Sequence, residues 1–342
     1  MKIIVDIMSG DKAPLEQLLG AHQAAVENPT VEMVFVGNEA IIRAIAAARG
    51  MNLDLHNLSI IHTDEVVTME DAPLSVVREK KDSSMGVGLK MLAEGKGDAF
   101  VSAGNTGALH AGSTLIVRRI KGIQKSAIAT ILPYQNPMLL IDSGANIEIV
   151  PETYVQFAKM GSVYMKHILG VENPRVGLLN IGAERQKGTK TVMEAYGLLE
   201  AAEGIHFIGN VEGKELPFGV CDVLVCDGFS GNIVLKLTEG CASYLVGKLK
   251  DVFYANPVSK ISYLGVKDGM KKLKKEMDAS EYGGAPLLGL SRTVIKAHGS
   301  SDAKAFRNAI KQAMGCVENH VTYEIAKLVV PELIPKESDD RG

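Results

Sequence analysis

The fold is decided by the stretch Asp98-Ala99-Phe100-Val101-Ser102-Ala103-Gly104-Asn105-Thr106-Gly107-Ala108-Leu109. Its first four residues form a short apolar run that predicts a buried strand, and residues 108–119 predict a helix. A strand that breaks into small residues and then opens a helix leaves free backbone N–H groups, which favour an anion such as phosphate. A tight turn with a capped helix and no ligand explains the same residues.

The order of strand, polar glycine-containing loop and helix recurs along the chain. It predicts a three-layer α/β/α fold with a mostly parallel sheet, at whose carboxyl strand ends a ligand binds. An asparagine follows five of the expected strands, which predicts either a shared polar cleft or ordinary turn chemistry. The other strands are expected at 3–7, 31–36, 58–62, 127–132, 138–142, 175–180, 205–208 and 221–226, and the asparagines are Asn105, Asn146, Asn180, Asn210 and Asn232.

The composition excludes several classes of protein. The chain has 342 residues and a net charge of −3, so no general affinity for nucleic acid is implied. Its four cysteines form no CxxC pair and have no histidine at zinc-site spacing, which favours buried thiols in a reducing cytoplasm and no metal. The N-terminus lacks the apolar core of a signal peptide, and no run of about 18 apolar residues is present to span a membrane.

Two short basic stretches allow both an ordinary and a functional interpretation. Lys80 and Lys81 form either a solvated helix end or part of an anion site. The second stretch follows the helix at 108–119, where cations complement the helix dipole or form a patch for an acidic protein partner. Its members are Arg118, Arg119, Lys121 and Lys125.

Residues 248–276 differ from the rest of the chain, because lysines alternate there with apolar residues. This pattern predicts a basic amphipathic projection, which lies on an anionic membrane surface or is simply a solvated helix. Otherwise we expect a single domain over 1–330, closed by a helix at 303–327, and a flexible tail at 331–342.

With these stretches in order, the chain resembles the bacterial phosphate acyltransferases of phospholipid synthesis over residues 1 to about 325. No single motif is specific for this family, but the number and order of the motifs together are specific for it. The departures are small: Ser9 stands where the family usually has glycine, and Arg185-Gln186 where it is often acidic or small. The motifs are Lys80-Lys81-Asp82-Ser83-Ser84-Met85, Ser102 to Ala108, Asn180-Ile181-Gly182 through Lys187-Gly188, Cys226 to Asn232, Gly283 to Gly289 and His298-Gly299-Ser300-Ser301.

The resemblance implies a fold shared with isocitrate and isopropylmalate dehydrogenases and with phosphotransacetylases, in a homodimer without a cofactor. It implies that a fatty acyl group passes from acyl-carrier-protein to inorganic phosphate. The acyl phosphate then serves a glycerol-3-phosphate acyltransferase at the membrane. The protein is expected to be cytoplasmic and peripherally membrane-associated.

This reaction needs a held phosphate and a stabilised oxyanion, because a thioester already has a good leaving group. We expect Lys187 to neutralise phosphate or the oxyanion, Asn180 to donate a hydrogen bond, and Asp227 or His298 to manage protons or orient a lysine. The carrier protein is expected at the patch of Arg118, Arg119, Lys121 and Lys125, and the membrane at Leu264 and Val266. The expected phosphate and substrate site comprises Ser102, Gly104, Asn105, Thr106, Gly107, Lys80, Lys81 and Asn232.

Three rival functions remain open at this point. A phosphotransacetylase would use coenzyme A thioesters with the same anion loop. A dehydrogenase is disfavoured, because no GxGxxG follows the first strand. A non-catalytic scaffold would bind the carrier protein at the membrane without consuming its thioester.

Overall fold

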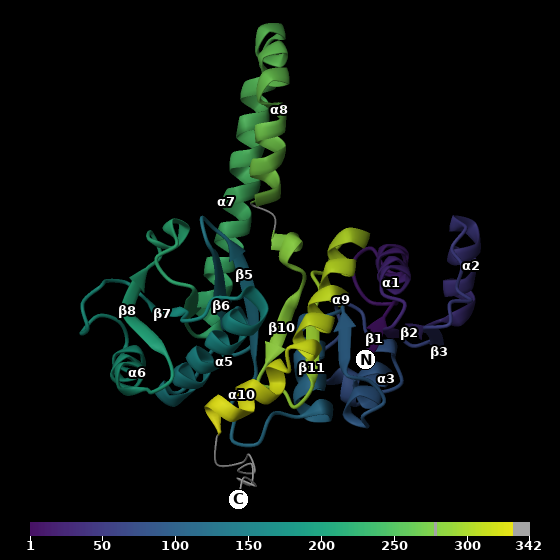
Figure 1. Ribbon diagram of the computed structural model, residues 1–342, viewed down its shortest axis with the longest axis horizontal. Helices are drawn as coiled ribbons and strands as arrows, with labels where there is room; N and C mark the ends of the chain where they lie inside the picture. The colour runs from purple at the N-terminus through teal and green to yellow at the C-terminus, as the bar shows by residue number, and fades with distance from the viewer. Residues whose placement is uncertain (277–278, 331–342) are drawn as a thin grey trace, which may run out of the picture.

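The structure, a computed structural model, describes residues 1–276 and 279–330. A sheet of eleven strands runs through the molecule in the order β3-β2-β1-β4-β11-β10-β5-β6-β9-β7-β8 (Figure 1). Helices cover both of its faces, so the expected α/β class with a mostly parallel sheet is confirmed. The strands are β1 (Lys2–Asp6), β2 (Glu32–Gly37), β3 (Leu58–His62), β4 (Ala99–Ser102), β5 (Ala127–Pro133), β6 (Pro137–Ile141), β7 (Arg175–Asn180), β8 (His206–Glu212), β9 (Val223–Val225), β10 (Ala285–Leu288) and β11 (Thr293–Lys296).

The helices follow the strands in the order that the sequence predicts, with two differences. The segment expected as one helix at 108–119 is a short α-helix followed by a π-helical turn at Ser113–Val117. The closing helix is broken at His320, whose φ of 49° interrupts it. The α-helices are α1 (Leu15–Glu27), α2 (Glu39–Arg49), α3 (Ser84–Ala93), α4 (Thr106–Gly112), α5 (Pro151–Leu169), α6 (Lys190–Ala201), α7 (Gly228–Tyr254), α8 (Pro257–Glu276), α9 (Ala303–Glu318) and α10 (Val321–Val329), with short 3-10 turns at Pro73–Val77, Leu216–Phe218 and Ala279–Tyr282.

Alternation along the strands creates the apolar layers. Val5 and Val101 face a core that includes Phe306 of α9, whereas Ile4 and Phe100 face a second core that includes Leu89 of α3. All of these side chains are fully buried. The central strands are therefore apolar on both faces, as a covered sheet requires.

The sheet reverses direction in its middle. β10 is antiparallel to both β11 and β5, and β5 is antiparallel to β6, whereas the other neighbouring strands are parallel. Three reversals leave β1, β4 and β11 running opposite to β6, β9 and β7. Their carboxyl ends therefore point in opposite directions along the sheet, so strand direction alone does not bring the five asparagines into one cleft. The sequence analysis assigned no strand to β10 or β11, so it missed this reversal.

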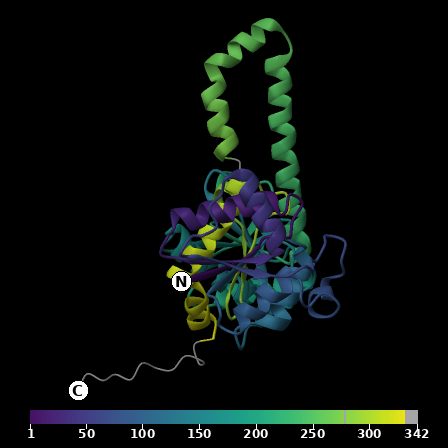
Figure 2. The same cartoon turned by 90° about the vertical axis from the view of Figure 1, so that its right-hand side faces the viewer.

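A helical hairpin made by α7 and α8 stands away from the rest of the molecule (Figures 1 and 2). The expected projection at 248–276 is thus seen, but α7 already begins at Gly228 and is 27 residues long. Phe253 and Tyr263 join the two helices near the tip, with their ring centroids 5.3 Å apart. None of the helices in the described part of the chain is both long and apolar enough to cross a membrane. The expected tail at 331–342 lies outside the described residues.

Candidate active site

Three adjacent strands, β1, β4 and β11, end in the polar residues Asp6, Ser102 and Lys296, which we call the N-terminal row. The Ser102 hydroxyl donates to Asp6 Oδ2 at 2.7 Å and accepts from the backbone N–H of Gly104 at 3.1 Å. Asp6 is fully buried, and burial raises the pKa of its carboxyl although the Ser102 hydroxyl opposes that rise. Ser102 therefore fixes the loop that follows β4 to the end of β1.

Two of the expected phosphate ligands instead hold a loop in place. Asn105 caps α4 by accepting from the N–H of Ala108, and its Nδ2 donates to the carbonyls of Met69 at 3.0 Å and Asp71 at 3.1 Å. Lys80 pairs with Asp71 at 2.6 Å, and its hydrogen bond lowers the pKa of that carboxyl. Asn105 and Lys80 thus both secure the segment around Asp71, and the Lys80 ammonium also donates to the carbonyl of Val66 at 3.0 Å.

The other expected members of the phosphate site lie around this loop. Thr106 and Lys81 are exposed, Gly104 is buried, and a Cβ on Gly107 would lie 3.0 Å from Cγ of Pro73. Gly107 is therefore explained by the close approach of the 3-10 turn at Pro73–Val77.

A C-terminal row follows β6, β9 and β7 at the opposite edge and comprises Asp142, Asp227 and Asn180. Asp227 caps α7 by accepting from the N–H of Ser230 at 2.8 Å and from its hydroxyl at 3.0 Å. Asn180 accepts from the N–H of Ile181 and donates to the carbonyl of Lys187 at 3.0 Å. Both side chains therefore organise the loops and helix that follow their strands.

Lys187 and the 102–107 loop do not share a pocket within one chain. β7 and β4 are six positions apart in the sheet, which at about 4.8 Å per strand is roughly 29 Å. Lys187 is exposed in the loop after β7, and its Cγ would lie 3.1 Å from a Cβ on Gly182. The prediction that Lys187 acts together with Asn105 is therefore wrong.

One face of α7 connects the two edges of the sheet. It carries Asn232, Lys236 and Glu239, whose spacing of four and then three residues places them on the same side of the helix. Asn232 lies beside the 142–146 loop, since a Cβ on Gly144 would be 3.5 Å from its Cγ. Lys236 pairs with Glu239 at 2.9 Å, and both of their charges shift the pKa of His298. The first three turns of α7 therefore lead from the C-terminal row to the loop after β11.

At that loop the structure gathers a group of charges that we call the α7 junction: Asp11, Lys236, Glu239, Lys296 and His298. Lys296 is only 8% exposed, and burial lowers its pKa to about 8, against the pull of Asp11 and Asp6. Burial also lowers the pKa of His298, whose Nδ1 lies 2.8 Å from the Ser300 hydroxyl. The junction contains His298, which the sequence analysis named, and Lys296 and Lys236, which it missed.

The expected docking patch for the carrier protein lies at the other edge. Arg118, Arg119, Lys121 and Lys125 are all exposed, in the segment between the π-helical turn and β5. His110 is largely buried, and burial is the main cause that lowers its pKa. The carboxylate of Asp142 raises this pKa, whereas the charges of Lys125 and Arg119 lower it further. The patch therefore borders the C-terminal row.

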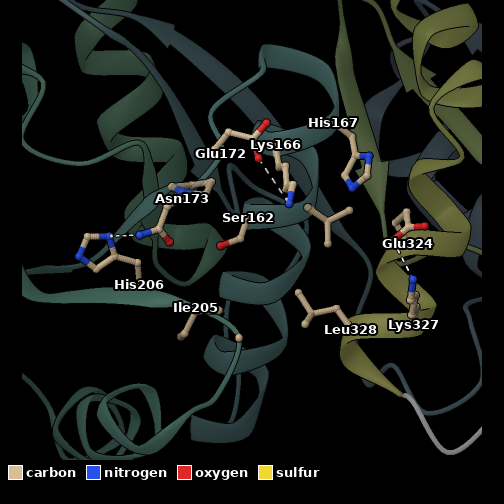
Figure 3. A pocket seen from close by; sticks show the side chains of 13 residues that line it. Ser162, Lys166, His167, Glu172, Asn173, Ile205, His206, Glu324, Lys327 and Leu328 are labelled. Atoms are coloured by element: carbon tan, nitrogen blue, oxygen red, sulfur yellow. Dashed lines mark hydrogen bonds and ion pairs between the residues drawn. The ribbon is translucent and has the colours of Figure 1, made fainter.

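A separate cavity is lined by residues that belong to neither row (Figure 3). It has a volume of about 420 Å³ and lies between α5, α10 and the start of β8. Glu172 lies 3.6 Å from Lys166, and Glu324 lies 4.0 Å from Lys327. Both of its lysines are more than half exposed, so each attracts a phosphate dianion less strongly than a buried lysine such as Lys296 does.

Comparison with known proteins identifies the family. A phosphate acyltransferase from Thermoanaerobacterium thermosaccharolyticum is 46% identical to this chain, over 96% of this chain and 96% of its own length. A second one, from Thermoanaerobacter pseudethanolicus, is 46% identical over 95% of this chain and 96% of its own length. Among solved structures, a phosphotransacetylase from Streptococcus pyogenes matches with a TM-score of 0.61 at 16% identity, over 93% of this chain and 94% of that one, which shows a shared fold. The model of a family described as fatty acid synthesis protein matches residues 1–324, and this chain belongs to that family together with its phosphate acyltransferases.

Proposed function

We propose that this acyltransferase moves a fatty acyl group from the thioester of acyl-carrier-protein to inorganic phosphate and releases an acyl phosphate. Family membership supports acyl transfer to phosphate. The observation that carries the proposal is the α7 junction, where Lys236, Lys296 and His298 gather beside the ends of β4 and β11. Two lysines that repel each other favour the binding of a multiply charged anion, to which the His298 ring can donate a hydrogen bond.

The chemistry places modest demands on the protein. An oxygen of hydrogen phosphate attacks the thioester carbonyl carbon, so a C–O bond forms, the C–S bond breaks, and the electron pair leaves on sulfur. The proton of hydrogen phosphate passes to the thiolate, which completes the balance. Because a free thiol has a pKa of about 8.5, this leaving group needs little acid catalysis. The protein has to hold the phosphate in line with the carbonyl and stabilise the oxyanion.

The sites of the two larger partners are part of the same proposal. Acyl-carrier-protein docks on the basic patch of Arg118, Arg119, Lys121 and Lys125. Its prosthetic group then reaches the polar face of α7 past Asn232. An acidic partner and a basic patch attract over a range of about 10 Å at moderate salt, which steers the encounter.

The helical hairpin provides the proposed contact with the membrane. Leu264 is 70% exposed and Val266 is 42% exposed on α8, with the basic residues Lys260 and Lys267 close by in sequence. Exposed apolar side chains among lysines favour an anionic lipid surface. We therefore infer a cytoplasmic, peripherally membrane-associated protein that delivers acyl phosphate to a glycerol-3-phosphate acyltransferase.

A homodimer is also proposed, because α7 exposes a further apolar surface. Tyr244, Leu245 and Val252 are each more than half exposed on α7. A second copy of the hairpin would bury this surface, since the same apolar face is present on both chains.

A single-turnover assay tests the function directly. Purified protein is mixed with radiolabelled acyl-carrier-protein thioester, with and without inorganic phosphate, and acyl phosphate is trapped with hydroxylamine. We expect thioester loss only when phosphate is present. A coenzyme A thioester serves as the comparison substrate, and faster turnover of that substrate would indicate a phosphotransacetylase. Tight binding of the carrier protein without phosphate-dependent thioester loss would indicate a scaffold.

A further inference from the structure

Lys296 is a charged residue at an almost entirely buried position. It is the last residue of β11 and pairs in register with Ser102 of β4. Its ammonium donates to two backbone carbonyls, that of Ala297 at 2.5 Å and that of Ala103 at 3.4 Å. Carbonyl oxygens carry only partial charge, so these contacts compensate the loss of water around an ammonium poorly.

Two further basic side chains from different elements act electrostatically on the same region: Lys236, and His298, whose lowered pKa favours its neutral form at pH 7. Lys236 comes from α7 and His298 from the loop after β11, and the charge of Lys236 acts on both Lys296 and His298. The carboxylates that oppose these charges are Asp11, the buried Asp6 and Glu239. The positive charges of Lys236 and Lys296 repel each other, so a bound anion would favour both of them, although Glu239 already pairs with Lys236 at 2.9 Å.

Polar groups without partners lie next to this cluster. Both amide atoms of the fully buried Gln17 lack a hydrogen-bond partner. A Cβ on Gly10 would lie 2.7 Å from Nε2 of Gln17 and 3.3 Å from the carbonyl of Gly299. The N–H of Asp11 donates to that carbonyl at 2.9 Å, which ties the loop after β1 to the loop after β11. Buried polar groups are normally paired, so the Gln17 amide leaves a donor beside the loop that a bound oxyanion can use.

We propose that Lys236 and Lys296, with His298 beside them, are the residues that bind the inorganic phosphate. This assigns to the ends of β4 and β11 and to α7 the role that the sequence pattern assigned to Lys187. Lys236 approaches the phosphate from the exposed side, and Lys296 holds it from beneath. The inference rests on the proposed function, because it names the binding site for that reaction's phosphate.

Phosphate affinity of single variants tests the assignment. Binding of inorganic phosphate is measured by calorimetry for the wild type, Lys236→Met, Lys296→Met and the control Lys96→Met, whose side chain is exposed at a distant turn. We expect the two junction variants to lose at least about tenfold in affinity, as removal of a charge-assisted contact does, and the control to change by less than twofold. In steady state the KM for phosphate should rise tenfold while the KM for the acyl donor stays within twofold.

Proton uptake gives a second readout that a purely structural lysine would not produce. A bound dianion favours the charged form of Lys296, so wild-type protein should take up protons when phosphate binds near pH 8.5. Calorimetry in buffers with different ionisation enthalpies measures this uptake, which should be lost in Lys296→Met and kept in Lys96→Met. If Lys296→Met does not fold, the phosphate affinity of Lys236→Met still tests the proposal. The Lys236 side chain is exposed, so its replacement should leave the fold intact.

The outcomes separate the inference from the proposed function. Phosphate affinity within twofold of wild type in Lys236→Met would overturn the inference, even if acyl transfer to phosphate is observed. Wild-type protein that never consumes the thioester in a phosphate-dependent way would overturn the proposed function, whatever the variants bind.

Discussion

Asp142 offers the most direct test of how the C-terminal row is built. Its carboxylate is fully buried and accepts five hydrogen bonds, from the N–H groups of Ile128, Gly144, Ala145 and Asn146 and from the Asn146 side chain. All five groups are donors. In Asp142→Asn an NH2 group must therefore replace one oxygen and face donors, whichever way the amide is turned.

The size of the effect follows from the number of bonds on each oxygen. Oδ2 accepts two of the five, at 2.7 and 2.8 Å, so the substitution loses at least two hydrogen bonds to a charged group. At about 1.5–3 kcal/mol each, the free energy of unfolding should fall by roughly 3–6 kcal/mol. Urea denaturation of the wild type and of Asp142→Asn at pH 7 measures this difference in the free energy of unfolding.

The control for Asp142→Asn is Asp251→Asn, whose carboxylate is 74% exposed on α7. The control substitution should change the free energy of unfolding by no more than about 0.5 kcal/mol. A loss of less than 1 kcal/mol in Asp142→Asn would show that the carboxylate does not organise the 143–146 loop.

Four further results are expected. Lys187→Ala should reduce phosphate affinity less than threefold, measured by calorimetry, because its loop lies six strands from β4. The double change of Leu264 and Val266 to Glu should release the protein from anionic vesicles in a flotation assay and leave single-turnover activity in solution unchanged; vesicle binding that persists would reject the membrane contact. Arg118→Gly should weaken carrier-protein binding by surface plasmon resonance without lowering the melting temperature, because Arg118 has a φ of 69° that glycine adopts freely. Since burial lowers the folded pKa of Lys296 to about 8, the penalty of burying its ammonium is present below pH 8 and disappears by about pH 10; the free energy of unfolding should rise over that window in wild type and not in Lys296→Met.

Local sequence patterns predicted most of the elements of the fold. The strands at 58–62 and 175–180 have the expected bounds, because apolar runs act over a few residues. The cap of α3 is equally local, since the Ser83 hydroxyl accepts from the N–H of Gly86 three residues later.

The arrangement of the site was not predictable in the same way. Whether the ends of two strands meet depends on every strand between them, and here the antiparallel β10, only four residues long, helps to reverse the sheet. The types of residue suited to a phosphate were identified, but Asn105 and Lys80 satisfy backbone carbonyls and a carboxylate instead. Such partners come from segments 36 and 9 residues away in sequence and leave no local signal.

Lys296 did leave a signal, though one that is easy to overlook. It lies inside the run Val294-Ile295-Lys296-Ala297, and a lysine among apolar residues is rarely buried without a reason. The pattern alone cannot distinguish a lysine that extends its ammonium to solvent from one whose ammonium is enclosed. The deciding fact is tertiary: Ser102 of β4 flanks it on one side, and α7 brings Lys236 toward it.

α7 is therefore the element on which the whole proposal depends. Its start is fixed by the Asp227 cap and by Gly231, where any Cβ would lie 1.9 Å from the carbonyl of Asp142. This close contact sets the rotation of the helix, and the rotation decides which face carries Asn232, Lys236 and Glu239 toward the loop after β11. The same helix then continues into the hairpin whose tip we place at the membrane. A single rigid element thus positions the phosphate site and the proposed membrane contact relative to each other, because an α-helix transmits its orientation along its length.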